Sequence, residues 1–187
     1  AQILFCAGNA KPLYVPEPLL EQALADSLGV DRTQLTRELV ADKLEFFELN
    51  NAGIRDLRGL EVAKNLKVLV LKDNLIKDIT PLVELANLRK LDLSGNRISS
   101  LLSLSGFSLE KMQKEIFEIQ QKLSARLGSS EQSPEMILEL SDLTERIKRG
   151  PWQLNELSLS NNRLLGLSGI SNLAFLQHLD VSGNALI

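Results

Sequence analysis

The feature that most constrains this chain is a leucine frame, L-x-x-L-x-L-x-x-N-x-I, that recurs along its 187 residues. Copies begin at Leu44, Leu66, Leu88, Leu154 and Leu176, and the first three starts lie 22 residues apart. The leucines of one such unit are shielded from water only when the next unit covers them, so the period predicts a stack of short units. Because aromatic residues make up only 4% of the chain, we interpret these leucines as its core.

The ninth position of the frame is an asparagine in four of the five copies. An amide side chain both donates and accepts hydrogen bonds, so we predict that these residues stack as a ladder that satisfies backbone groups at the turns. The first copy departs from the pattern, with Phe47 at a leucine position and Ala52 at the asparagine position, as expected of a terminal unit. The four ladder residues are Asn74, Asn96, Asn162 and Asn184.

The frame, with segments such as IKDITPLVELANL, resembles the leucine-rich-repeat family in its 22-residue, internalin-like bacterial type. The resemblance implies an α/β repeat fold, a right-handed solenoid with a parallel β-sheet on its concave face. It also implies a secreted or cell-surface module that binds a protein or a glycan. An intracellular regulatory subunit like the short-repeat phosphatase regulators is the cytoplasmic alternative, and it would not need a bacterial type of cap.

Residues 1–43 precede the repeats, and two helices are predicted there. The first runs from Pro16 to Leu28, with Pro18 in its first turn and Gly29 as its stop, and the second runs from Thr36 to about Ala41. These segments resemble the helical cap that opens secreted bacterial leucine-rich-repeat proteins. A solenoid needs such a polar cover over its first core layer.

The repeats cover 44–104 and 152–187, and the segment 105–151 interrupts them. No leucine frame begins inside it, and apolar residues instead recur at spacings of three and four, which predicts a hairpin of two amphipathic helices like a short coiled coil. We expect it to leave after Leu104 from the return side of the third unit, so that the sheet stays unbroken. The last repeat is expected to be truncated at Ile187.

Two interpretations of this hairpin remain open. It is a tolerated insertion, since closure entropy grows slowly with loop length, or it is an assembly element that self-associates or docks a partner helix. Exposed apolar residues at Phe107, Phe117 or Leu127 would favour the second interpretation.

Side chains alternate along a strand, so residues between the frame leucines should point outward from the sheet and form the concave face. Phe46, Val68 and Val70 are predicted to make an exposed apolar patch near the cap, with charged side chains beside it. We predict that the face contacts a protein or glycan partner through Phe46, Glu48, Val68, Val70, Lys72, Lys90, Asp92, Glu156, His178 and Asp180.

Other functional classes lack their residues in this sequence. There is no nucleophile elbow, no Gly-rich phosphate loop and no pair of histidines, so we predict no enzyme, and His178 is interpreted as a solvated surface residue. The single Cys6 and the single histidine exclude an internal disulfide and a zinc site of the usual Cys/His type, and no metal or cofactor is predicted. A net charge of -3 with scattered basic residues disfavours nucleic acid, and no apolar run reaches the length of a membrane span.

Overall fold

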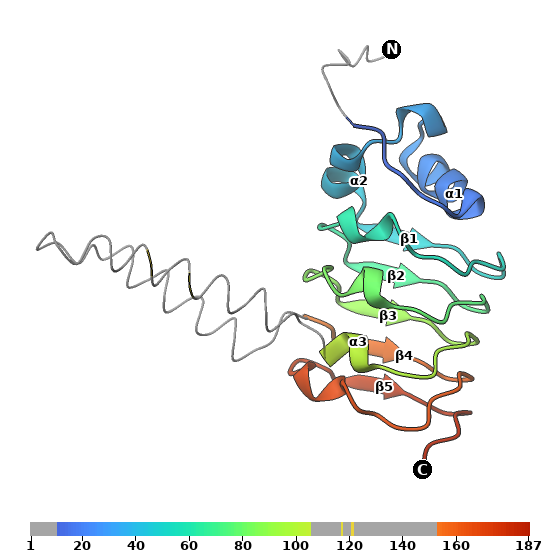
Figure 1. Ribbon diagram of the computed structural model, residues 1–187, viewed down its shortest axis with the longest axis vertical. Coiled ribbons are helices and arrows are strands. Elements are labelled where there is room, and N and C mark those ends of the chain that lie inside the picture. Colours follow the sequence, from blue (N-terminus) through green and yellow to red (C-terminus); the bar gives the residue numbers. More distant parts are fainter. Residues whose placement is uncertain (1–10, 106–116, 118–120, 122–152) are drawn as a thin grey trace, which may run out of the picture.

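A computed structural model describes residues 11–105, 117, 121 and 153–187. Five short parallel strands form one sheet in which each strand pairs with the next along the chain (Figure 1). The predicted solenoid with a parallel sheet and a helical cap is therefore confirmed. The strands are β1 (Phe46–Glu48), β2 (Val68–Val70), β3 (Lys90–Asp92), β4 (Glu156–Ser158) and β5 (His178–Asp180).

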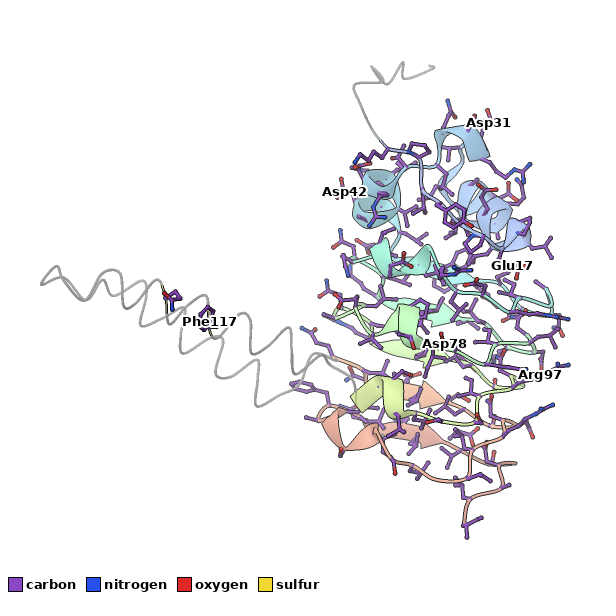
Figure 2. The ribbon with its side chains drawn as sticks, in the orientation of Figure 1. Glu17, Asp31, Asp42, Asp78, Arg97 and Phe117 are labelled. Carbon is purple, nitrogen blue, oxygen red and sulfur yellow. The ribbon has the colours of Figure 1, made fainter. Side chains whose placement is uncertain are left out.

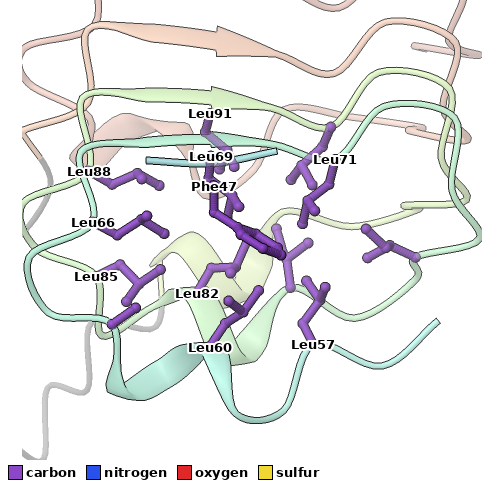
Figure 3. Packing of buried hydrophobic residues seen from close by; sticks show 14 of the residues in the cluster. Phe47, Leu57, Leu60, Leu66, Leu69, Leu71, Leu82, Leu85, Leu88 and Leu91 are labelled. Atoms are coloured by element: carbon purple, nitrogen blue, oxygen red, sulfur yellow. The ribbon is translucent and has the colours of Figure 1, made fainter. Parts of the chain in front are cut away.

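The frame leucines form one continuous core between the sheet and the return segments. Phe47, Leu69 and Leu91 occupy the middle of the first three strands in a paired register and are at most 1% exposed. They face leucines of the return segments, such as Leu60 and Leu82 (Figure 3). Burying one such side chain contributes about 1.5–3 kcal/mol, so each added unit is stabilised mainly by the layer it shares with its neighbour.

The asparagine ladder is present, and each amide joins two consecutive units. In Asn96, Oδ1 accepts a hydrogen bond from the Ile76 N–H at 3.0 Å, and Nδ2 donates to the carbonyl oxygens of Leu71 and Leu93, each at 2.9 Å. The amides of Asn74, Asn162 and Asn184 make equivalent bonds. The backbone groups involved are mostly buried, and without the amides they would lack partners away from water.

The sheet continues without a break across the interruption of the repeats. Strands β3 and β4 pair directly, with Leu91 opposite Leu157, as the sequence predicted. The chain leaves the repeats at α3 (Leu102–Ser105). The predicted hairpin lies outside the described residues except for Phe117 and Gln121, both of which are helical, and Cys6 lies outside them too.

The return segments also stack on one another. They contain the 3-10 helices η2 (Leu60–Val62), η3 (Thr80–Leu82) and η4 (Ile170–Asn172), and α3 packs against η4. Gly169 precedes η4 with φ 111°, and a Cβ atom there would lie 2.2 Å from the carbonyl oxygen of Leu101. Only glycine allows this close approach, so the units on both sides of the interruption contact each other on the return side as well as in the sheet.

The cap contains α1 (Pro18–Leu28), η1 (Arg32–Gln34) and α2 (Arg37–Lys43), close to the two predicted helices. Gly29 ends α1 in the left-handed conformation, and the Thr36 hydroxyl accepts a hydrogen bond from the Leu39 N–H at the start of α2. Leu20 and Leu24 are fully buried in the same cluster as the first repeats. Glu17 ties the cap to the first repeat, because its carboxylate accepts a hydrogen bond from the Arg55 N–H at 3.3 Å (Figure 2).

Candidate binding face

The outward side chains of the five strands form three columns, which together we call the open face. The strand register places equivalent residues of all five units side by side, about 4.8 Å apart from strand to strand. The first column is Phe46, Val68, Lys90, Glu156 and His178, and the second is Glu48, Val70, Asp92, Ser158 and Asp180. The 22-residue frame continues them into a third column, Asn50, Lys72, Ser94, Ser160 and Ser182.

The end of the first column nearest the cap is apolar. Phe46 is 56% exposed, and Val68, its neighbour in the first column, is half-buried. The expectation that Val70 is exposed was wrong: it is only 9% exposed, because it sits in the second column among the side chains of both flanking strands. We call Phe46 and Val68, together with the buried Val70 in the neighbouring column, the apolar patch.

Two ion pairs cross between neighbouring strands in the middle of the face. Lys72 Nζ lies 3.1 Å from Asp92, and Lys90 Nζ lies 2.7 Å from Glu156. Asp92 was expected to offer an exposed charge, and instead it is buried beside its partner. The hydrogen bond and the charge of Lys90 lower the pKa of Glu156, and the same hydrogen bond raises the pKa of Lys90.

Each acidic residue of the second column is held by the residue two positions later. The Asn50 amide donates to Glu48 at 2.6 Å, and the Ser94 and Ser182 hydroxyls donate to Asp92 and Asp180 at 2.6 and 2.7 Å. The Ser182 hydroxyl and backbone N–H lower the pKa of Asp180. These bonds fix the carboxylates on the face in a defined orientation before any partner arrives.

At the opposite end, a hollow of about 460 Å³ lies over β3, β4 and β5. Its lining includes Gln177 and five of the residues predicted from the sequence, Lys90, Asp92, Glu156, His178 and Asp180. Gln177 was not predicted because it precedes the strand.

An ion pair was also not predicted, again because its two residues precede their strands. Glu45 and Lys67 precede β1 and β2 and form an ion pair at 2.7 Å along the rim of the open face. The second position of the leucine frame is the signal that could have found this rim, since it recurs with the same 22-residue period.

In the part of the chain that the structure describes, no group of three or more His, Cys, Asp or Glu residues is placed to hold a metal ion. Over those same residues, no helix combines the length and apolar character needed to cross a bilayer.

Comparison with known proteins agrees with this architecture. A family model described as "Leucine Rich repeats (2 copies)" matches residues 64–107. The sequence has no match among curated proteins. Internalin C2 of Listeria monocytogenes is a structural match with a TM-score of 0.57 and 24% identity, covering 94% of this chain and 69% of that one.

Two further structures are less similar. An internalin (inlF) of Listeria monocytogenes has a TM-score of 0.49 and 19% identity over 96% of this chain and 61% of that one. A structure of the CBM51-2 and INT domains of ZmpB from Clostridium perfringens, in complex with GlcNAc, has a TM-score of 0.43 and 26% identity over 50% of this chain and 20% of that one.

The parallel sheet, the asparagine ladder and the family match define a leucine-rich-repeat solenoid. Within that class its fold is internalin-like, with a helical cap in front of the repeats, as the sequence resemblance implied.

Proposed function

We propose that this chain is a non-catalytic recognition module that binds another protein through the open face. The observation that carries the proposal is Phe46, which is 56% exposed on a strand whose next residue, Phe47, fills the core position. The repeat frame requires no apolar residue at this outward position, and Val68 extends the apolar surface onto the next strand. Large aromatic side chains flanked by aliphatic ones are typical centres of protein interfaces.

The framework behind the patch supports this proposal. The strands are paired in register, and their carboxylates are already oriented by neighbouring side chains. A partner would therefore meet a preformed surface, and little ordering of the face would oppose binding. The cap packed on the first repeat fits a secreted or cell-surface protein of the internalin-like type, and we propose that location over a cytoplasmic one.

A random peptide library displayed on phage tests the proposal, because it samples many candidate partner sequences at once. Clones are selected on the immobilised full chain and then measured on the variants Phe46→Ser and Leu19→Ser. Leu19 is the matched control, because it is also 56% exposed but lies on α1 of the cap. We expect selected clones to lose at least about tenfold in affinity on Phe46→Ser, in line with the loss of a buried aromatic anchor, and to be unaffected by Leu19→Ser.

Clones that bind both variants equally well would overturn the proposal for this face. Binding of soluble oligosaccharides that depends on Phe46, with no peptide selected, would also overturn it and would assign the face to glycans.

One observation favours a second candidate function, an assembly element in the segment 105–151. Phe117 is helical and 58% exposed, and exposure at this position was the observation expected to favour a contact surface in the predicted hairpin (Figure 2). Light scattering of the full chain, beside a variant in which Gly-Ser replaces residues 105–150, tests this candidate. A dimer that becomes a monomer on deletion supports it, and two monomers rule out self-association through this segment.

A further inference from the structure

Both lysines of the open face are in ion pairs, whereas two of its acidic residues are not. Besides His178, the basic residues of the face are Lys72 and Lys90, and each lysine is paired with an acidic residue of the same face, Asp92 and Glu156. Glu48 and Asp180 are the two acidic residues that remain, and neither has an ion-pair partner among the described residues. Their hydrogen-bond donors, Asn50 and Ser182, are neutral and leave both negative charges uncompensated.

Charged residues also border the apolar patch. On the rim, Glu45 and Lys67 neutralise each other at 2.7 Å. Glu48 stands two residues from Phe46 on β1, so the two side chains lie on the same side of the sheet, about 7 Å apart along the strand. Within the described repeats, the exposed rim cation that has no ion-pair partner is Arg89, which precedes β3, one strand from Val68 and two strands from Phe46. Beside Phe46 itself, on β1, the unpaired charge is therefore the negative charge of Glu48.

Glu48 and Asp180 also share one column of the face. The register runs from Glu48 through Val70, Asp92 and Ser158 to Asp180, which is four strand-to-strand steps. At about 4.8 Å for each step, the two carboxylates are separated by roughly 19 Å. An extended peptide rises about 3.3 Å per residue, so roughly six residues would span the distance.

We infer that the partner presents a basic segment to the open face: an apolar side chain on the apolar patch, a Lys or Arg beside it at Glu48, and a second basic group about six residues away over Asp180. This inference rests on the proposed function and specifies the chemistry of the partner. An acidic segment would place its charges against two carboxylates that have no compensating cation, and that arrangement is unfavourable.

The same peptide library also tests this inference. Among clones that depend on Phe46, Lys and Arg should outnumber Asp and Glu at least about threefold relative to the unselected library. A consensus peptide is then synthesised, and its Kd is measured by fluorescence polarisation at low salt. Glu48→Gln and Asp180→Asn keep the oxygen that accepts the hydrogen bond from Asn50 or Ser182 and remove only the charge. We expect each to weaken binding about two- to fivefold, the range of an exposed ion pair.

Glu38→Gln is the matched control, because Glu38 is exposed on α2 and its substitution removes the same charge from the cap, outside the sheet. It should leave the Kd unchanged, and 0.5 M NaCl should abolish the difference between wild type and Glu48→Gln. Selection repeated on Glu48→Lys should shift the clones toward acidic residues.

The outcomes distinguish this inference from the proposed function. Clones that depend on Phe46 but carry no excess of basic residues overturn the inference and leave the proposed function standing. An equal effect of Glu38→Gln and Glu48→Gln also overturns it, because the charge would then act through the whole molecule. If no clone depends on Phe46, the proposed function itself fails.

Discussion

The Asn162 amide donates a hydrogen bond of 2.9 Å to the carbonyl oxygen of Leu93, which precedes it by 69 residues in the chain. The same side chain accepts from the Ile98 N–H at 3.0 Å and donates to the carbonyl of its own unit at Leu159. One buried side chain therefore connects the repeats on either side of a long interruption.

Asn162→Ala should destabilise the fold markedly. The change leaves buried backbone groups of two units without partners, and each lost bond is worth about 0.5–1.5 kcal/mol, so we expect a loss of about 2–4 kcal/mol. Urea unfolding followed by circular dichroism measures it. Asn87→Ala is the control, because exposed Asn87 makes a single side-chain bond, to the Lys64 carbonyl. A loss no larger than that of the control would contradict the role given to the ladder.

Substitution of the two neighbouring phenylalanines on β1 should reduce the stability of the fold by very different amounts. Phe47 is 1% exposed and Phe46 is 56% exposed. Phe47→Ala leaves a cavity under the cap and should cost about 3–5 kcal/mol, whereas Phe46→Ala should cost less than about 1 kcal/mol. Thermal and urea unfolding of the two variants provide the comparison. A large loss of stability for Phe46→Ala would mean that this side chain is structural, and the proposed contact site would lose its support.

The repeats should stay joined when the interrupting segment is removed. Replacing residues 105–150 by Gly-Ser places Leu88 and Leu154 at the 22-residue spacing of the first three units. Because β3 already pairs with β4 in register, we expect the shortened chain to unfold cooperatively at a urea midpoint no lower than that of the full chain. Loss of cooperative unfolding would show that the segment is required for the fold.

The carboxyl of Glu156 should titrate below its ordinary range while Lys90 is present. The hydrogen bond from Lys90, and then its charge, stabilise the ionised form and lower the pKa of Glu156. The stability contributed by this pair is therefore present above the pKa of the unfolded chain and is lost as the pH falls through the lower, folded value.

Lys90→Met should raise the pKa of Glu156 toward its ordinary value, as followed by NMR titration of the carboxyl carbons. Asp180 is the internal control, because its pKa is lowered by Ser182 and should not move in this variant. An unchanged titration of Glu156 would show that the ion pair does not persist in solution.

Leucine-to-alanine substitutions at equivalent positions of the frame should reduce stability by different amounts, because the leucines differ in burial. Leu69 and Leu179 occupy the same place in β2 and β5, but Leu69 is fully buried and Leu179 is 37% exposed. Leu69→Ala should cost about 3–5 kcal/mol, and Leu179→Ala less than half of that. Equal losses in urea unfolding would contradict this burial gradient along the described repeats.

The repeat architecture follows from the sequence alone. The 22-residue spacing specifies which leucines are core and which asparagines form the ladder, because every unit repeats the same local geometry and contacts mainly its neighbours. It also placed Phe46 and Glu48 on the outward side of the sheet, since side chains alternate along a strand. The N-cap of α2 at Thr36 and the C-cap of α1 at Gly29 followed from local capping signals.

The contacts among the outward residues, in contrast, depend on the assembled sheet. Burial of Val70 and Asp92 depends on side chains from both flanking strands, and a single repeat carries no information about them. The pairing of Lys72 with Asp92 and of Lys90 with Glu156 depends on register between units, one of which follows the long interruption. The free charges at Glu48 and Asp180 emerged only once those pairs were assigned, because electrostatic balance is a property of the assembled face.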